Sequence, residues 1–458
     1  MGVVAGAAWL LGRSARELTL FAAAGLAIGG IDDLAVDLLW LARRVWRHLT
    51  VYRRHAPATM ESLPPPDRPG RLAIIIAAWQ EGEVIGRMLA AAVARLDHPD
   101  YRIYVGTYPN DPATNAAVTA LGDPRIRLVP GTRPGPTTKA ECLNRVWRAL
   151  IADVEAEGVA VKAVVLHDAE DVVHPLELRL FDRLIERFDL VQLPVLPLVS
   201  SGNWWARAIS ATYVDEFAEA HVRQLPVREA LGAGVPSAGV GCAIGRAAIG
   251  RIAAAQGGEP FDEQSLTEDY EIGLKLKAAG GRGAFVTIPA APGRPPVAVR
   301  AHFPDRFEAA VRQRARWMTG IALAGWDRLR WDGGLAERWM RLRDRRSVLA
   351  AIILAAAYAG SLLDLLCFGL AVRPAWPWAM GRLLDLTSAL FLWRLAMRVM
   401  ALSRDHGWRM GLAAVPRVLL ANAIAIAAAR RAIAAYVPGR APRWDKTSHH
   451  FPETLPCD

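Results

Sequence analysis

The stretch that decides the fold is RLAIIIAAW at residues 71–79, followed by EGEVIGRMLAAAVARL at 81–96 and YRIYVGTY at 101–108. The first and third segments are short and apolar, as buried strands are, whereas the second repeats apolar residues at helical spacing. Strands and amphipathic helices that alternate in this way predict βαβ units and a mostly parallel sheet. Further strands are expected at 125–130, 163–168 and 189–195, and further helices at 137–154 and 174–188.

The composition predicts that this α/β domain is joined to membrane helices. The chain has 458 residues, of which 53% are hydrophobic and 22% charged, and its mean hydropathy is +0.17. So much apolar surface excludes a disordered protein. The net charge of +10 does not indicate nucleic-acid binding, because the arginines cluster beside apolar segments and not in a stripe with aromatic residues. The four cysteines are far apart in sequence and predict neither a metal site nor a disulfide framework.

Three segments have the length and hydropathy of membrane crossings, at residues 18–41, 347–372 and 376–397. Arginine-rich sequence follows the first, so the positive-inside rule places that end in the cytoplasm and the N-terminus outside. A fourth segment, 411–437, is interrupted by Arg417 and Arg430, which predicts an interfacial or protein-packed helix. The C-terminus is then cytoplasmic.

Three acidic residues, Asp32, Asp33 and Asp37, fall within or beside the first apolar segment. Charged groups in lipid are costly, so they need partners. We expect them to pair with arginines; a transport pathway is the alternative. The predicted division of the chain is a first membrane helix and basic flank (1–55), a proline-rich linker (56–70), the α/β domain with interfacial helices (71–340), membrane or interfacial helices (341–440) and a tail (441–458).

Carboxylates follow the expected strand at 163–168, in the sequence HDAED from His167 to Asp171. Ligands of parallel sheets bind at the carboxyl ends of the strands. Asp168 and Glu170 have the spacing of a D-x-D motif, and oxygen ligands suit Mg²⁺ or Mn²⁺ bridged to substrate phosphates. The structural alternative is a solvated acidic turn or a helix cap.

Two further motifs lie downstream. In LTED (266–269), Asp269 is a candidate general base beside Glu268; alternatively, Thr267 caps the helix that follows and Asp269 stabilises its first turn. In QRARW, Gln313, Arg316 and Trp317 share one helical face. Arg316 could neutralise a diphosphate and the Trp317 indole offers a stacking surface; a surface helix with its aromatic residue against the membrane is the alternative.

In this order, and followed by membrane helices, the three motifs resemble those of the processive, membrane-embedded family 2 glycosyltransferases. The stretches HDAEDVVHPLELRLF, EFAEAHVRQLPVREALGAGVPSAGVGCAIGR and RWDKTSHHFP resemble the bacteriophage adsorption protein B group of glycosyltransferases over nearly the whole chain. The resemblance implies a GT-A nucleotide-binding domain that faces the cytoplasm of a bacterial inner-membrane, multi-pass protein. Full-length members usually continue into a cyclic-di-GMP-binding C-terminal domain; because this sequence stops at Asp458, we expect no such domain within it.

The resemblance also assigns roles to residues. Trp79 and Glu81 stand where the family's first strand lines the nucleotide pocket, and Asp111 stands in place of an acidic pair that holds uracil. Lys139 matches a lysine that reaches the nucleotide or its phosphate. The remaining implied roles are metal–diphosphate binding by Asp168 and Glu170, a small-residue turn beside the acceptor at Gly241 and Cys242, a base at Asp269, and acceptor and diphosphate contacts by Gln313, Arg316 and Trp317.

The implied activity is inverting, metal-dependent transfer of a sugar, with a UDP-N-acetylhexosamine as donor, to a growing envelope or exopolysaccharide glycan. A homo-oligomer or an export partner would complete a path across the bilayer. Two alternatives remain open at this point. One is the transfer of a single sugar to a lipid phosphate, and the other is a non-catalytic scaffold of the envelope or of phage adsorption.

Overall fold

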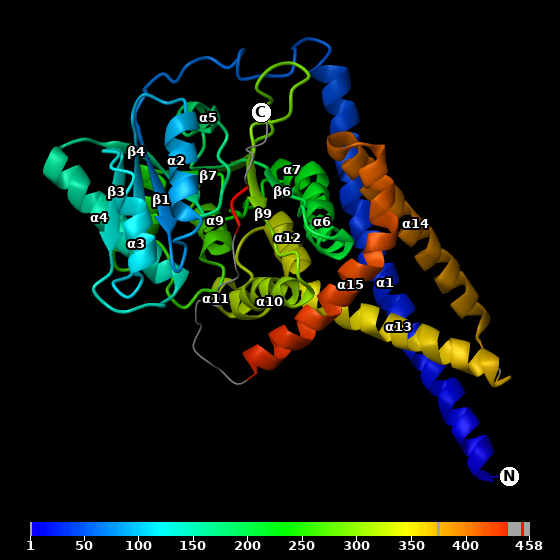
Figure 1. Ribbon diagram of the computed structural model, residues 1–458. Coiled ribbons are helices and arrows are strands. Elements are labelled where there is room, and N and C mark those ends of the chain that lie inside the picture. The colour runs from blue at the N-terminus through cyan, green and yellow to red at the C-terminus, as the bar shows by residue number, and fades with distance from the viewer. Residues whose placement is uncertain (1, 373–375, 438–449, 453–458) are drawn as a thin grey trace.

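A seven-stranded sheet forms the centre of the α/β domain (Figure 1). The computed structural model describes residues 2–372, 376–437 and 450–452. Six of these strands run parallel to one another. The seventh, β7, lies between β4 and β5 and is antiparallel to both. In spatial order the strands are β3 (Ile126–Pro130), β2 (Tyr101–Thr107), β1 (Arg71–Ala77), β4 (Val161–His167), β7 (Cys242–Gly245), β5 (Leu190–Gln192) and β8 (Gly283–Phe285).

Both faces of this sheet are buried, which explains why its strands are continuous apolar runs. Along β1, Ala73 and Ile75 face one hydrophobic core, and Leu72 and Ile74 face the other. The first core is closed by α4 (Lys139–Glu157), α8 (Arg246–Ala255) and α9 (Glu268–Ala278), and the second by α2 (Ile85–Arg95), α3 (Pro112–Thr119) and α5 (Glu177–Leu184). The α/β class and the alternation expected from residue 71 onward are confirmed.

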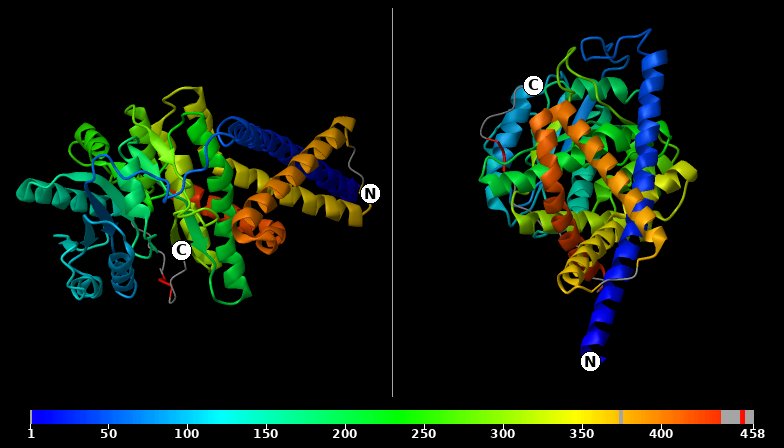
Figure 2. Two further views of the ribbon diagram at one scale, coloured as in Figure 1. Left: turned by 90° about the horizontal axis from the view of Figure 1, so that it is seen from above. Right: turned by 90° about the vertical axis from the view of Figure 1, so that its right-hand side faces the viewer.

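A second group of elements lies between this domain and the long apolar helices (Figures 1 and 2). A two-stranded parallel sheet, β6–β9, belongs to it. Two of its helices contain π-helical turns, η1 and η2. The elements are β6 (Val195–Leu198), α6 (Trp204–Glu219), η1 (Ala220–Gln224), α7 (Leu225–Ala230), β9 (Val299–His302), α10 (Phe307–Trp317), η2 (Met318–Ala324), α11 (Gly325–Leu329) and α12 (Leu335–Arg345).

Among the described residues, four helices are long enough and apolar enough to cross a membrane, judged by length and composition. They are α1 (Gly2–Thr50), α13 (Ser347–Gly369), α14 (Trp378–His406) and α15 (Trp408–Tyr436). The helix α1 packs along α13 and α14, and the right-hand view of Figure 2 shows its N-terminal end extending well beyond them. A straight helix of 49 residues is about 73 Å long at 1.5 Å per residue, more than twice the roughly 30 Å of a hydrocarbon core.

The doubtful fourth segment forms a single helix, α15, that packs against α10 and α6 of the α/β side. Arg417, which interrupts its apolar sequence, donates to both carboxylate oxygens of the buried Asp215 on α6, at 2.6 and 3.0 Å. The charge of Arg417 is therefore paired inside the protein. This agrees with a protein-packed helix, one of the two arrangements expected from the sequence. The helix α12 runs across the domain boundary expected at residue 340, and most of the expected tail, 441–458, lies outside the described residues.

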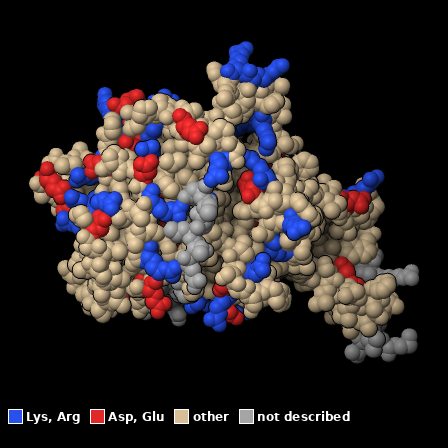
Figure 3. All heavy atoms as spheres, turned by 45° about the horizontal axis from the view of Figure 1, so that its top comes forward, with Lys and Arg blue, Asp and Glu red and all other residues tan. Residues whose placement is uncertain are grey.

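On the face drawn in Figure 3, basic and acidic side chains are intermixed over the α/β domain. The exception is the tip formed by the end of α1 and the turn after it, where Arg44, Arg53 and Arg54 are exposed. Arg44 lies near the end of α1, and Arg53 and Arg54 follow it; the cytoplasmic location of this end stays a prediction of the positive-inside rule.

Candidate functional site

A small polar cavity lies where α9 begins, beside the end of α10. Its lining includes five of the residues singled out from the sequence, although they come from motifs up to 178 positions apart. The cavity has a volume of about 50 Å³ and is lined by Thr138, Lys139, Ser265, Leu266, Thr267, Glu268, Asp269, Arg316 and Trp317. Ligand pockets usually measure about 300–1,000 Å³, so a nucleotide sugar bound here would extend along the strand ends.

Lys139 joins two of the predicted acidic motifs. It is the first residue of α4, after the N-cap Thr138, and its ammonium group lies 2.5 Å from Asp168 Oδ1 and 4.0 Å from Glu268 Oε1. Burial alone would lower the pKa of Lys139, but the carboxylates of Asp168, Glu268 and Asp269 raise it well above its usual value. The lysine is therefore a permanent cation at the entrance of the cavity.

Glu268 and Asp269 occupy the first turn of α9, where carboxylates interact favourably with the helix dipole. Glu268 is buried, and burial together with the neighbouring Asp269 raises the pKa of Glu268 to about 7. Burial also raises the pKa of Asp269, which the Lys139 ammonium partly opposes. A carboxyl with a raised pKa is better matched to proton transfer near neutral pH than an exposed one.

The Asp269 carboxylate is held from two sides. Its Oδ1 accepts the backbone N–H of Tyr270 at 2.7 Å. Its Oδ2 faces Gly239, whose φ is +77°, and a Cβ atom placed on that glycine would lie 2.2 Å from this oxygen. Only a residue without a side chain allows this approach, so Gly239 belongs to the site although the sequence analysis did not single it out.

The other wall of the cavity comes from α10. Arg316 and Trp317 line it, and Gln313 stands one turn earlier on the same helix, as the spacing predicted. Within the part of the chain that the structure describes, Gln313 Oε1, Arg316 Nε and Thr267 Oγ1 are buried atoms without a hydrogen-bond partner. Buried polar atoms normally have partners, so three such atoms in and beside one cavity suit a ligand that supplies them.

The alternative reading of LTED as a helix cap holds for the position of Thr267 but not for its side chain. Thr267 is the N-cap residue of α9, but its side chain makes no capping hydrogen bond. Its Oγ1 and Cγ2 are instead packed against Gly320 of η2, where a Cβ atom would lie 2.6 Å from each of them. The π-helical turn after the QRARW motif thus sets the distance between α10 and the start of α9.

The residues expected around the nucleotide lie at the ends of β1 and β2. The indole of Trp79 packs edge-on against Tyr108 at 5.2 Å between ring centroids, and Glu81 is buried nearby. Both carboxylate oxygens of Asp111 accept hydrogen bonds from the backbone. Its Oδ2 accepts the N–H of Gln80 at 2.5 Å, and its Oδ1 accepts the N–H of Thr114 at 3.3 Å. Asp111 therefore caps α3 and fixes the turn after β1, and neither role was foreseen.

Gly241 and Cys242 lie behind the cavity and are not part of its lining. Gly241 adopts φ +58°, and a Cβ atom there would lie 2.7 Å from Val299 Cγ2. Cys242 is buried at the start of β7, where its sulfur lies 2.9 Å from Ser237 Oγ. The small-residue turn that does touch a cavity residue is the one before them, at Gly239.

The donor atoms at the site suit a divalent cation only together with a substrate. Among the described residues no group of three or more His, Cys, Asp and Glu side chains is placed to hold a metal. Asp168 and Glu170 offer two carboxylates, which is the number that Mg²⁺ commonly takes from protein when phosphates complete its shell.

One consequence can be tested by unfolding. The pKa of Glu268 in the folded protein, about 7, exceeds its ordinary 4.5, so the folded state binds more protons between these pH values and loses stability as pH rises through them. Glu268→Gln removes this loss. We therefore expect the variant to melt at a higher temperature than the wild type at pH 8, with the difference disappearing toward pH 4.5. A constant difference at all pH values would contradict the raised pKa.

Comparison with known proteins supports a family assignment. The sequence profile described as "Glycosyltransferase like family 2" matches residues 69–320. Bacteriophage adsorption protein B of Escherichia coli (strain K12) and bacteriophage N4 adsorption protein B of Escherichia coli O157:H7 are each 39% identical to the chain over 477 residues. The alignment covers 97% of this chain but 63% of each relative, so the chain spans less than two thirds of their length.

A solved structure shares the fold. The mannosyltransferase PcManGT from Pyrobaculum calidifontis, in complex with GDP-Man and Mn²⁺, superposes with a TM-score of 0.53 and covers 95% of this chain and 100% of its own. Its sequence identity of 18% means that the likeness concerns the fold alone. With the profile covering more than half of its residues, the chain belongs to the glycosyltransferase like family 2, and its α/β domain has the GT-A-like architecture.

Proposed function

We propose that the protein is an inverting glycosyltransferase of the bacterial inner membrane, which transfers a sugar from a nucleotide sugar, a UDP-N-acetylhexosamine, to a growing envelope or exopolysaccharide glycan. The observation that carries the proposal is the cavity in which Lys139, Asp269 and Arg316 converge from three separate motifs. A scaffold has no need for a buried carboxylate, two cations and an indole around one space, whereas sugar transfer uses each of them.

In the proposed reaction Asp269 accepts the proton of an acceptor hydroxyl, whose oxygen attacks the anomeric carbon of the donor and displaces the nucleotide diphosphate. Lys139 and Arg316 lie on either side of the cavity and stabilise the negative charge that develops on the diphosphate. Trp317 offers its indole to the acceptor sugar, and Gln313 offers an amide oxygen. The new glycosidic bond has the opposite anomeric configuration, because the attack comes from the face opposite to the leaving group.

A divalent cation, Mg²⁺ or Mn²⁺, would be held by Asp168 and Glu170, and when bound it would neutralise charge on the diphosphate. The Mn²⁺ in the solved mannosyltransferase supports this choice of metal. Trp79 and Tyr108 would form the wall of the nucleotide subsite, with Glu81 behind them. The bilayer would surround α1, α13 and α14, and the α/β domain would face the cytoplasm beside the arginines that follow α1.

The test follows release of the nucleotide diphosphate by the detergent-purified protein with Mg²⁺ or Mn²⁺, for a panel of nucleotide sugars that includes UDP-N-acetylglucosamine and GDP-mannose. Release with one donor, abolished by chelation, supports the proposal and names the donor. Product length then separates a polymer from a single transferred sugar, the alternative with a lipid phosphate acceptor. No release from folded protein with any donor would favour the scaffold alternative.

The metal and diphosphate site makes a separate prediction. Asp168→Ala removes a carboxylate from the strand end and leaves Lys139 without its closest anionic partner. We expect nucleotide release to fall by at least about 10²-fold, which corresponds to the loss of a charged group at a site of charge development. Asp100→Ala is a suitable control, since Asp100 also pairs with a cation, Arg71, but at the opposite end of the sheet. Equal activity of both variants would exclude Asp168 from the site.

A further inference from the structure

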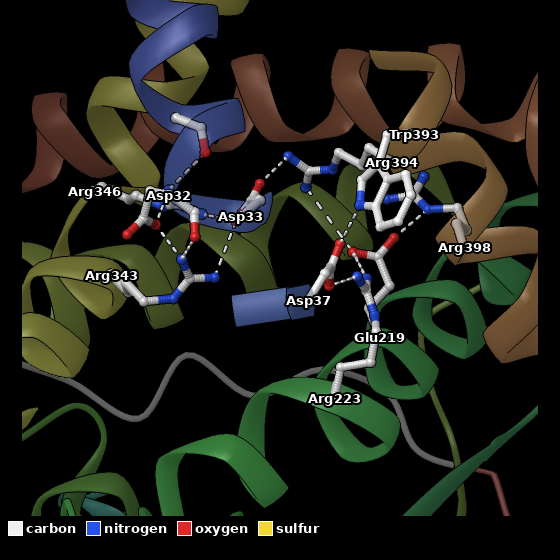
Figure 4. Close-up of polar contacts among 11 residues, drawn as sticks. Asp32, Asp33, Asp37, Glu219, Arg223, Arg343, Arg346, Trp393, Arg394 and Arg398 are labelled. Atoms are coloured by element: carbon white, nitrogen blue, oxygen red, sulfur yellow. Dashed lines mark hydrogen bonds and ion pairs between the residues drawn. The ribbon is translucent and has the colours of Figure 1, made fainter. Parts of the chain in front are cut away.

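The helix α12 has two polar faces that bind different parts of the protein. On one face, Trp339 Nε1 donates to Asp32 Oδ1 at 2.6 Å, and Arg343 pairs with Asp32 and, at 3.0 Å, with Asp33. Asp32 and Asp33 belong to the membrane helix α1 (Figure 4). Arg346, which directly follows α12, also pairs with both aspartates. The acidic residues of α1 are thus paired with arginines, as expected from the sequence.

The opposite face of α12 binds the helix that carries Asp269. Asp344 Oδ2 accepts the hydroxyl of Tyr270 at 2.6 Å, and Tyr270 is the residue whose backbone N–H holds the Asp269 carboxylate. Both oxygens of Asp344 also accept from Arg228 of α7, at 2.8 and 2.9 Å. Tyr270 and Arg228 are buried, so this network is shielded from water and its hydrogen bonds are strong.

The same face also holds the loop on the other side of Asp269. Glu337 of α12 accepts the backbone N–H of Gly234 at 2.7 Å, while Arg228 donates to the Gly234 carbonyl. Five residues later this loop places Gly239 against Asp269 Oδ2. The helix α12 therefore contacts both segments that confine the Asp269 carboxylate, one through Asp344 and the other through Glu337.

We propose that α12 is a positioning element that links membrane helix α1 to the catalytic Asp269, with Asp344 and Tyr270 as positioning residues on the inner face and Arg343 as the tie to α1. Sugar transfer then depends on the correct docking of α1, because displacement of α12 moves both segments around the base. A displacement of about 1 Å at a catalytic group can lower the rate about 10²-fold. The inference rests on the proposed function of Asp269 and adds a residue path to it.

Two inner-face variants of the full chain test the positioning role. Tyr270→Phe removes only the hydroxyl, and Asp344→Asn keeps an acceptor but removes the charge opposite Arg228. We expect the turnover number to fall about 10- to 100-fold in each, with the KM for the donor within about twofold of wild type and the pH optimum displaced. Tyr104→Phe is the matched control, since Tyr104 is also buried and its hydroxyl lies near Arg102 and Asp153, away from α12.

The link to the membrane helix has its own pair of variants. Asp32→Ala removes the contacts of Asp32 with Trp339 and Arg343 of α12 and leaves the Arg343–Asp33 pair. Asp215→Ala removes the more deeply buried contact of α15 with α6 and leaves α12 untouched. Hydrogen exchange of the backbone amides at residues 266–272 reports the order around Asp269 without any need for activity. We expect at least about tenfold faster exchange in Asp32→Ala and wild-type exchange in Asp215→Ala.

The outcomes separate this inference from the proposed function. If the wild type releases nucleotide diphosphate and Asp269→Asn does not, wild-type turnover in Tyr270→Phe and Asp344→Asn overturns the positioning role alone. If the wild type releases none, the exchange experiment still decides, and equal exchange at 266–272 in Asp32→Ala and Asp215→Ala overturns the link. Faster exchange only in Asp32→Ala supports it.

Discussion

Replacing Asp269 by asparagine is expected to lower the turnover number for sugar transfer by about 10²–10⁴-fold, the range that a positioned general base contributes. The amide has nearly the shape of the carboxylate and keeps an oxygen that can accept the Tyr270 N–H, but it cannot take a proton from the acceptor. Nucleotide binding should remain, because Trp79 and Tyr108, which we propose for the nucleotide subsite, lie outside the cavity. Steady-state release of the nucleotide diphosphate measures the turnover number, and calorimetry with the nucleotide measures its binding.

Glu263→Gln is the matched control for this experiment. Glu263 lies on the loop before α9 and is exposed, so the same chemical change is made six residues from Asp269 without entering the cavity. The control should retain wild-type turnover. Asp269→Asn with wild-type turnover would show that another group removes the proton, and loss of nucleotide binding as well as turnover would indicate a folding defect.

Adding a single methyl group at Gly239 is expected to abolish transfer. In Gly239→Ala the new Cβ would lie 2.2 Å from Asp269 Oδ2, a separation that atoms do not adopt, so the carboxylate or the loop must move. The alanine would also have to adopt φ +77°, which costs about 1–2 kcal/mol for a residue with a side chain. We expect at least about 10²-fold lower turnover from a displacement of this kind.

Gly232→Ala separates the effect of the Cβ contact with Asp269 from the effect of the backbone conformation. Gly232 has a similar backbone conformation, with φ +71°, but nothing lies within 4 Å of the position that its Cβ would take. The two variants should therefore lose similar stability from the backbone, which thermal unfolding measures. Only Gly239→Ala should lose activity, and comparable turnover in the two variants would mean that Gly239 acts through folding and not through Asp269.

The fold could be predicted because it is encoded locally. Segments such as 71–79 and 161–167 are apolar on both faces, which a strand needs only when helices cover both sides of its sheet, and the intervening helices have one apolar face each. The antiparallel β7 was missed because CAIG, four residues long, carries too little periodicity to identify a strand. The π-helical turns were missed for a similar reason, since they extend helices without changing their apolar pattern.

For the site, the sequence singled out residues that the structure brings together, while their chemical roles stay predictions. Lys139, Asp269 and Arg316 meet at one cavity as their motifs indicated. The family resemblance implied ligand contacts for Asp111 and Gly241, but in the structure Asp111 accepts hydrogen bonds from the backbone and Gly241 packs against Val299. Gly239, Tyr270 and Asp344 act through contacts between distant segments. Those contacts depend on tertiary packing, which no local pattern records.

The sequence also predicted that Asp32, Asp33 and Asp37 pair with arginines, without naming the partners. Those partners come from three helices and one connecting residue: Arg343 lies on α12, Arg394 on α14 and Arg223 on η1, and Arg346 lies between α12 and α13 (Figure 4). Such pairs have sequence separations of up to 361 residues, so no rule based on neighbouring residues could have selected them.

This arrangement dictates an order of events during synthesis. The helix α1 leaves the ribosome first, yet Arg343, the partner of its Asp32, is 311 residues away. At roughly 5–20 residues per second, about 15–60 s pass before that arginine has been made. During this interval Asp32 and Asp33 lack their arginine partners, whereas Arg223, the partner of Asp37, is made earlier, 186 residues after that aspartate. An inserted α1 should therefore remain near the aqueous exit of the insertion machinery or be shielded by a chaperone. Ribosomes that stall before residue 343 should leave a product that membrane proteases remove.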